Sequence, residues 1–337
     1  MPNILEKIKQ AGLVGRGGAG FPAHLKWKAV ASAKSKKKYL VVNFSEGELG
    51  LFKDIHIMQK FPDVVFSGIR LALDFIGSRD CYFNYNKEYY KKTKSLVLPL
   101  IKRYEGAGYR FYIYGEEPSY IGGEETALLN AIEGRRTEPR AKPPFPTTSG
   151  LFSCPTLVHN IETLYNIALV GQQKFENKRF YCLSGGKSEG VYFLPADWSI
   201  QKVLKQTENY PVFNFFVQIG GSVSGEVLNS NQIKKREVEG AGSIEVYPIK
   251  TKPRDLMLKW FDFYACESCG KCCPCRLGSY NISKILKQNK KIDWKEIINL
   301  LESMEKTSFC ALGKMTYIPV ESYIKNVLKL KISLKQI

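Results

Sequence analysis

The chain has 337 residues, of which 44% are hydrophobic, and it carries 50 Lys and Arg against 32 Asp and Glu. This composition excludes a disordered or fibrous protein, and the length allows two or three domains. No stretch approaches the roughly 20 apolar residues of a membrane helix, and the start of the chain lacks the apolar run of a secretion signal. We therefore expect a cytoplasmic protein with no direct membrane insertion. The formal charge of +18 would suit an anionic partner, but much of the excess is scattered lysine, which is typical of a solvated face.

The first half of the chain alternates short apolar runs with helical patterns. Strands are predicted at 39–43, 81–85 and 109–114, and helices at 3–11 and 54–75. Strands that alternate with helices favour a parallel sheet, with ligands bound where the strands end. We therefore predict an α/β fold for this part of the chain.

The remainder of the chain changes its pattern twice. A proline-rich loop or linker at 139–155 and a helix at about 156–170 close the first domain, 1–172. From 173 to 252, short strand-like pieces separated by glycines resemble a small β-grasp (ubiquitin-like) module. From 253 to 337, apolar residues at intervals of three and four indicate a helical bundle.

Four cysteines near the end of the chain have the spacing of an iron-sulfur ligand set. Two residues separate Cys269 from Cys272 and Cys272 from Cys275, and Cys310 follows at a distance. A tight loop can direct three thiolates at one [4Fe-4S] cluster while the fourth arrives from elsewhere. A structural zinc site is the competing interpretation, but zinc ligands usually come as two separated Cys pairs. Electron transfer is therefore the working hypothesis.

A glycine-rich loop, 15–22, follows the first predicted helix. Four glycines in six residues let its backbone approach an anion, and Arg16 and Lys26 add positive charge, so a phosphate or pyrophosphate would fit. The loop follows a helix rather than a strand, and no Gly-Lys-Ser/Thr follows it, so it is neither a Rossmann fingerprint nor a Walker A loop. A simple turn is the alternative.

Three polar clusters in the same domain could complete a ligand site. Residues 43–48 follow a predicted strand, residues 120–125 open a helix with two acids in its first turn, and residues 160–163 carry amide and hydroxyl groups. The acids could accept hydrogen bonds from sugar hydroxyls or a flavin ring, and the last cluster could hold a ribityl chain. The alternatives are acids that complement a helix dipole and an ordinary helix N-terminus.

Taken together, these motifs resemble those of the NADH-binding flavoprotein subunit of respiratory complex I and of its relatives in NAD-linked hydrogenases and formate dehydrogenases. The resemblance runs from about Gly12 to the neighbourhood of Cys310. Its strongest segments are 15–22, 47–54, 123–130, 133–136, 139–146 and 267–272. The family implies an α/β flavin domain, a β-grasp module and a helical cluster domain, with FMN, a [4Fe-4S] cluster and NAD(H) bound.

The resemblance also implies roles for single residues. FMN would be bound by Gly15, Arg16, Gly17, Lys26, Asn43, Ser45, Glu46, Tyr120, Gly123, Glu124, Glu125, His159, Asn160 and Thr163. NADH would be bound by Gly18, Ala19, Gly20, Phe21, Lys26, Glu48, Lys142 and Phe145. The cluster ligands would be Cys269, Cys272, Cys275 and Cys310. No side chain need act as a general acid or base, and Glu48 and Glu125 would support chemistry that the flavin carries.

The chain departs from the family pattern beside the implied flavin site. Where the family reads Asn-Ala-Asp-Glu-Gly-Glu-Pro-Gly, Phe44, Ser45 and Leu49 replace Ala, Asp and Pro. His159 replaces the first residue of an Asn-Asn pair. Because Ser45 removes a carboxylate and Phe44 adds bulk, we expect these departures to affect nucleotide affinity more than the cluster.

The function that the resemblance implies is electron input, in which NADH gives a hydride to FMN and electrons then pass singly to the cluster and to other subunits. The partners would be a [2Fe-2S] thioredoxin-like subunit and a larger iron-sulfur subunit of a complex I-like oxidoreductase. Alternatives are the diaphorase subunit of an NAD-linked hydrogenase or formate dehydrogenase, and a non-catalytic electron-relay subunit with impaired nucleotide binding. A zinc-stabilised nucleic-acid binder is disfavoured by the cysteine spacing.

Overall fold

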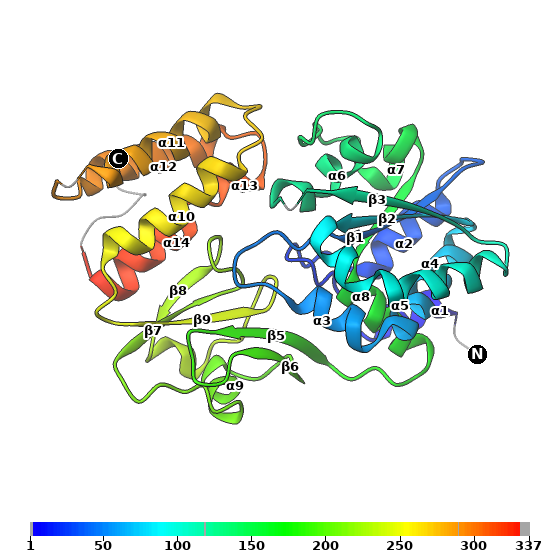
Figure 1. Ribbon diagram of the computed structural model, residues 1–337, viewed down its shortest axis with the longest axis horizontal. Helices are drawn as coiled ribbons and strands as arrows, with labels where there is room; N and C mark the ends of the chain where they lie inside the picture. Colours follow the sequence, from blue (N-terminus) through cyan, green and yellow to red (C-terminus); the bar gives the residue numbers. More distant parts are fainter. Residues whose placement is uncertain (1–2, 118, 289, 331–337) are drawn as a thin grey trace. The chain divides into compact units, whose positions relative to one another are not determined.

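The computed structural model describes residues 3–117, 119–288 and 290–330, which form two compact units (Figure 1). The first unit comprises Met1–Gly47 and Phe52–Asn177, and the second comprises Glu48–Leu51 and Lys178–Ile337. The chain thus leaves the first unit for four residues and then returns to it. Apart from residues 173–177, which belong to the first unit, the segments predicted as a β-grasp module and a helical bundle fall in the second unit. The boundaries of three domains stay a prediction.

A four-stranded parallel sheet forms the centre of the first unit, with the strand order β3-β2-β1-β4. The strands are β1 (Tyr39–Phe44), β2 (Asp80–Asn86), β3 (Arg110–Glu116) and β4 (Thr156–Asn160). Because all four run in the same direction, their C-terminal ends meet at one edge, where Asn43 of β1 lies in register with Asn160 of β4.

Helices cover both faces of this sheet (Figure 1). They are α1 (Ile4–Gln10), α2 (Ala23–Ser32), α3 (Lys53–Lys60), α4 (Pro62–Ile76), α5 (Lys87–Glu105), η1 (Ile121–Gly123), α6 (Glu125–Ile132), α7 (Pro146–Ser149), η2 (Leu151–Ser153) and α8 (Ile161–Gly171). Leu128 of α6 packs in one apolar cluster with Val41 and Val158. On the opposite face, the ring of Phe66 in α4 stacks on that of Phe83 in β2, with centroids 6.0 Å apart.

The structure corrects two of the predicted helices. The helix predicted at 54–75 is two helices, because Pro62 has no N–H for an intrahelical bond and instead occupies the first position of α4. The prediction of a helix from 156 is wrong, because residues 156–160 form strand β4 beside β1. The helix starts only after Asn160, whose side chain accepts a hydrogen bond from Glu162 N and caps α8.

The predicted β-grasp module is a five-stranded mixed sheet with the order β6-β5-β9-β7-β8. The strands are β5 (Lys178–Ser184), β6 (Gly190–Pro195), β7 (Phe215–Ile219), β8 (Glu226–Asn229) and β9 (Ser243–Pro248). Strands β5 and β9 pair in parallel, and the other pairs are antiparallel. Helix α9 (Ile200–Gln206) buries Ile200 and Val203 in the core of the module, and a short turn, η3 (Gln232–Lys234), follows β8.

The last part of the chain is helical, as its periodicity predicts. Its elements are α10 (Pro253–Glu267), α11 (Cys273–Lys287), α12 (Trp294–Thr307), α13 (Ala311–Lys314), α14 (Tyr317–Tyr323) and the π-helical turn η4 (Ile324–Leu328). Trp260, Ile282 and Leu301 are fully buried within this bundle. Among the described helices, none has both the length and the apolar character that crossing a membrane requires.

Candidate functional site

Polar groups of the first unit gather where strands β1 and β4 end. Asn43 Nδ2 donates a hydrogen bond to the main-chain oxygen of Gly123 (2.9 Å), and Asn43 Oδ1 accepts one from Ser45 N (3.2 Å). A Cβ atom added to Gly123 would lie 3.1 Å from the main-chain oxygen of Ser45, so the two loops approach closely. Within the described part of the chain, the buried Oγ of Ser45 has no hydrogen-bond partner. A polar ligand at this edge would satisfy it.

The glycine-rich loop is fastened beside the same edge. Gly15 N donates a hydrogen bond to the main-chain oxygen of Phe21 (2.9 Å), which closes the loop between α1 and α2. Arg16 N donates another to Thr163 Oγ1 (2.9 Å) in the first turn of α8. The loop and the start of α8, about 150 positions apart in the sequence, are thereby held together.

The glycines of this loop leave open space beside its backbone. A Cβ atom added to Gly17 would lie 3.2 Å from Asn160 Cβ, so the loop backbone approaches the end of β4. Gly18 and Gly20 have φ values of +110° and +64°, which side chains rarely adopt, and no atom would lie within 4 Å of a Cβ added to either. We call the glycine-rich loop, 15–22, together with Asn43, Ser45, Asn160 and Thr163, the strand-edge site.

Two lysines and two glutamates form an ion-paired group around the start of α6. Lys26 Nζ lies 2.8 Å from Glu125 Oε2, and Lys142 Nζ lies 2.7 Å from Glu124 Oε1 and 3.4 Å from Glu125 Oε1. Burial alone would raise the pKa of Glu125, but the charges and hydrogen bonds of Lys26 and Lys142 outweigh it and lower the pKa. Glu125 is therefore ionised and able to accept hydrogen bonds.

The aromatic residues predicted to meet NADH are accessible. The side chains of Phe21 and Phe145 are 49% and 55% exposed, and Ala19 is exposed on the glycine-rich loop. Tyr120 lies against the loop that follows β1, because a Cβ atom added to Gly47 would come within 2.8 Å of Tyr120 N. Loops that bear the predicted residues thus lie side by side within the first unit.

A buried ionic group that the sequence analysis missed lies directly behind Asn160. Lys53 is only 1% exposed, and its Nζ lies 2.5 Å from Asp54 Oδ1 and 3.3 Å from Glu162 Oε2. Asn160 Nδ2 donates a hydrogen bond to Asp54 Oδ2 (2.5 Å). Burial alone would lower the pKa of Lys53, but the neighbouring carboxylates outweigh it and raise the pKa, so the lysine is charged. Nothing in the local sequence separates Lys53 from the solvated lysines.

Glu46 completes this group and caps helix α3. Its carboxyl group accepts hydrogen bonds from Lys53 N (3.2 Å), Asp54 N (3.1 Å) and the hydroxyl of Tyr89 (3.1 Å). Burial and the charge of Asp54 raise its pKa to about 8. Glu46 therefore binds a proton more readily than an exposed glutamate does.

The structure places Glu48 within the second unit. Its Oε1 accepts hydrogen bonds from Ser224 Oγ (2.7 Å), Ser224 N (3.1 Å) and Val223 N (3.4 Å), in the turn between β7 and β8. A Cβ atom added to Gly221 would lie 1.9 Å from that oxygen, so only glycine permits this contact. Glu48 is thus anchored in the β-grasp module, and its contact with NADH stays a prediction.

Two departures from the family pattern are accommodated in the core. Phe44 is fully buried, and its ring lies 5.2 Å from that of Tyr85 and 5.3 Å from that of Tyr89. Because neighbouring residues of a strand face opposite sides, its bulk lies on the face opposite Asn43. His159 is also buried, and its Nε2 accepts a hydrogen bond from Trp27 Nε1 (2.8 Å). Burial lowers the pKa of His159 to about 3, so the imidazole is neutral.

Four cysteines converge within the second unit. Cys275 lies in the first turn of α11, while Cys272 caps α11 and Cys310 caps α13. The segment around Cys310 meets the other cysteines, because Phe309 N lies 3.5 Å from Cys272 Sγ and a Cβ atom added to Gly313 would lie 2.9 Å from Cys275 Cβ. Burial, followed by the charges of Cys272, Cys310 and Cys269, raises the pKa of Cys275 to about 11. We call Cys269, Cys272, Cys275 and Cys310 the four-cysteine site.

Main-chain and hydroxyl groups support these sulfur atoms. Phe309 N donates a hydrogen bond to Cys272 Sγ (3.5 Å), and Ser268 Oγ lies 3.5 Å from Cys275 Sγ. A Cβ atom added to Gly313 would lie 2.9 Å from Cys275 Cβ, so glycine lets α13 pack against α11. Cys266 and Cys273 are exposed, as expected for positions outside the ligand set.

The arrangement suits a multi-iron cluster. In the described residues, no three His, Cys, Asp or Glu side chains converge closely enough to share a single metal ion. A [4Fe-4S] cluster takes one thiolate on each of its four irons, so the four cysteines supply the number and type of ligand that it needs.

Comparisons with known proteins agree with both sites. Residues 8–169 match the family model of the Nuo51 FMN-binding domain, and residues 255–328 match that of the NADH-ubiquinone oxidoreductase-F iron-sulfur binding region. The F 2 subunit of NADH-quinone oxidoreductase of Rhizobium meliloti (strain 1021) is 31% identical over 96% of this chain and 86% of its own length. The F subunit of the same enzyme of Rickettsia bellii (strain OSU 85-389) is 31% identical over 96% and 88%.

The chain belongs to the family of F subunits of NADH-quinone oxidoreductase. This membership confirms the predicted enzyme class, an NADH dehydrogenase, and the predicted FMN and [4Fe-4S] cofactors. The α/β fold with a second sheet and C-terminal helices is also confirmed, because the air-oxidised NAD+-reducing [NiFe]-hydrogenase has a similar chain, with a TM-score of 0.89 and 29% identity over 96% of this chain. This member of the family spans only 61% of that hydrogenase chain.

Proposed function

We propose that this family member oxidises NADH with FMN held at the strand-edge site and delivers electrons to a [4Fe-4S] cluster held at the four-cysteine site. One observation carries the proposal: a single chain contains both an open glycine-rich loop at the C-terminal edge of a parallel sheet and four converging thiols. When bound, FMN accepts a hydride from NADH and the cluster accepts single electrons, so the chain itself supplies binding and orientation.

The strand-edge site offers FMN both charge and hydrogen bonds. Arg16 and Lys26 would balance the phosphate, and the open main chain of residues 15–20 can bring its N–H groups to it. The unpartnered Oγ of Ser45 and the amide of Asn160 would bind polar atoms of the flavin. Behind them, the charged Lys53 group fixes Asn160, because it holds Asp54, which accepts the hydrogen bond from the amide of Asn160.

The same loops offer NADH a binding surface. Phe21 and Phe145 are exposed rings on which its aromatic groups can stack. Lys142 supplies a positive charge, and the ionised Glu125 can accept hydrogen bonds from ribose hydroxyls.

The electrons leave the chain through partner subunits. The relatives are subunits of NADH-quinone oxidoreductases, so we assign this chain partners that carry iron-sulfur groups. In our proposal these are a [2Fe-2S] thioredoxin-like subunit and a larger iron-sulfur subunit, and the complex is cytoplasmic. A second candidate function, the electron-input part of an NAD+-reducing hydrogenase, is favoured by the similarity to that enzyme at a TM-score of 0.88.

Anaerobic addition of NADH to the purified chain tests the proposal. The flavin absorbance should bleach, and ferricyanide should then restore it. A flavin that stays oxidised would instead support the electron-relay alternative, in which nucleotide binding is impaired. Identification of the polypeptides that co-purify with the chain separates the quinone-linked assembly from the hydrogenase.

A further inference from the structure

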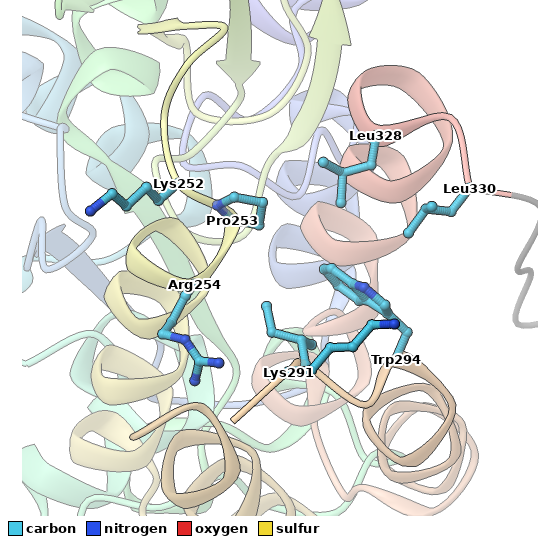
Figure 2. Close-up of a pocket in the computed structure, with 8 residues that line it drawn as sticks. Lys252, Pro253, Arg254, Lys291, Trp294, Leu328 and Leu330 are labelled. Carbon is cyan, nitrogen blue, oxygen red and sulfur yellow. The ribbon is translucent and has the colours of Figure 1, made fainter. Parts of the chain in front are cut away.

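A groove of about 360 Å³ lies at the end of the helical bundle where α11 finishes and α12 begins (Figure 2). It lies between the start of α10, the loop before α12 and the segment after η4. Helix α11 has 15 residues, so this end is about 20 Å from the end that bears Cys275. The groove is therefore separate from the four-cysteine site.

The floor of the groove is apolar. Trp294, Ile292 and Leu328 line it together with Pro253 and Leu330. Figure 2 shows Trp294, Leu328 and Leu330 facing Pro253 across the opening. Leu330 is still 38% exposed, so part of this apolar surface remains in contact with solvent. A floor of this kind gains free energy when another apolar group covers it.

The rim of the groove is strongly basic. Three of the eight residues that line the groove, Lys252, Arg254 and Lys291, are basic, and none of the eight is acidic. The neighbouring Asp293 already caps α12, because its side chain accepts a hydrogen bond from Glu296 N (3.1 Å).

The positive charge of Arg254 on this rim is fixed in place and meets neutral acceptors. Its guanidinium donates hydrogen bonds to the main-chain oxygens of Leu286, Gln288 and Lys290. Carbonyl groups orient a guanidinium without cancelling its charge. Lys252 and Lys291 extend from the same rim and are exposed. The groove thus combines a preorganised positive rim with an apolar floor.

Size and charge narrow the choice of occupant. A cavity of about 150 Å³ holds one benzene, so this groove has room for about two such groups and not for a whole dinucleotide. Residues 331–337 carry two lysines and no acid, so their charge does not complement the basic rim of the groove. A second copy of the chain would present the same basic rim, so its groove would not complement this one either. Trp294 is the single aromatic residue of the lining, whereas single-stranded nucleic acid is usually held by successive stacking residues.

We propose that this groove docks an acidic segment of a partner subunit, which inserts one or two large apolar side chains beside Trp294 and places carboxylates against Lys252 and Lys291. The inference rests on the proposed function only in that the chain works as a subunit of a larger assembly. Buried apolar anchors would provide affinity, and the charged rim would provide rate and orientation of association.

Site-specific photocrosslinking from Leu330 tests the proposal. The full chain, with p-benzoylphenylalanine at this rim position, is expressed with its native assembly and irradiated, and the crosslinked peptides are sequenced by mass spectrometry. The expected product is a peptide of another polypeptide that is rich in Asp and Glu and contains Leu, Ile or Phe. A crosslink to residues 331–337, to a second copy or to nucleic acid, or the absence of any crosslinked polypeptide, would overturn the proposal.

Charge reversal provides the matched measurement. In the variant Lys252→Glu with Lys291→Glu, retention of the other polypeptides on the tagged chain should weaken by about tenfold. The control, Lys34→Glu with Lys36→Glu, makes the same change of charge at exposed lysines of the first unit and should retain them. Equal losses in the two variants, or no loss in either, would contradict docking at the groove.

NADH-dependent reduction of the flavin in the isolated chain distinguishes the two proposals. It should be the same in the wild-type chain and in the variant Lys252→Glu with Lys291→Glu, because neither residue belongs to the strand-edge site. A chain that reduces its flavin but shows no docking would refute only the groove. A chain that docks but leaves its flavin oxidised would refute only the proposed NADH oxidation.

Discussion

The strand-edge site and the four-cysteine site achieve convergence in different ways. The strand-edge site joins segments that are far apart in the sequence of the first unit, such as those of Arg16 and Thr163. Hydrogen bonds and close backbone approach at glycines hold these segments together. The four-cysteine site takes four equivalent sulfur atoms from two segments, 269–275 and 310, of one helical region. A site with many unlike contacts should lose function gradually, whereas a site with four like ligands should fail when one is removed.

Removal of one thiol should give the largest effect. We expect Cys310→Ala to abolish the [4Fe-4S] cluster, because three thiolates leave one iron without its protein ligand. Reduction of the flavin by NADH should persist. Iron and sulfide analysis checks the first expectation, and anaerobic absorbance checks the second. Cys273→Ala, at an exposed cysteine that is adjacent to the ligand Cys272, is the control and should keep its iron. A full iron content in Cys310→Ala would refute the ligand assignment.

Replacement of the buried Lys53 should destabilise the part of the fold that supports the strand-edge site. Lys53→Met leaves Asp54 and Glu162 without their counterion, and breaking a buried ion pair in this way costs about 3–5 kcal/mol. Urea unfolding measures the free energy of unfolding of the variant. Lys60→Met, at an exposed lysine of the same helix, should change it little. Equal stability of the two variants would show that Lys53 is not the counterion of this group.

Loss of one charge beside the open loop should have a moderate effect. Glu125→Gln removes the charge that pairs with Lys26 and Lys142, so we expect kcat/KM for NADH to fall by about tenfold, equal to about 1.4 kcal/mol of transition-state binding. Iron content should not change. The exposed Glu105→Gln serves as the control in the same steady-state assay. Unchanged kinetics in Glu125→Gln would remove this residue from the site.

We also expect a change in pH dependence at Glu46. Its pKa is raised in the folded protein from 4.5 to about 8, so the folded state binds the proton more tightly than the unfolded state. Stability should therefore fall as pH rises between these values. Glu46→Gln cannot titrate, so its free energy of unfolding should decline less over that range. Urea unfolding at pH 5.5 and pH 8 compares the slopes, and parallel slopes would contradict the buried proton.

Much of this structure could be predicted from local sequence patterns. The spacing of Cys269, Cys272 and Cys275, the glycine-rich loop and three of the four parallel strands are local features, and each could be predicted from a few neighbouring residues. The cysteine spacing predicted the [4Fe-4S] cluster, and the family resemblance then implied FMN and NAD(H). Helix α11 and its capping cysteine follow the predicted helical pattern.

Non-local pairing explains what could not be predicted. Strand β4 has five residues that continue directly into α8, and its register with β1 depends on contacts more than a hundred residues away. Lys53 is buried because Glu162 and Asn160 arrive from α8 and its cap. Glu48 is anchored by Ser224, which belongs to the β-grasp module. No local pattern encodes such partners.

An anaerobic titration of the reconstituted chain with NADH, followed by absorbance and electron paramagnetic resonance, tests most directly whether one chain couples the two sites. We predict that the flavin bleaches, that the signal of a reduced [4Fe-4S] cluster appears, and that Cys310→Ala loses that signal while its flavin still bleaches. A wild-type chain that binds FMN and iron but whose flavin remains oxidised and whose cluster remains silent under excess NADH would contradict the account.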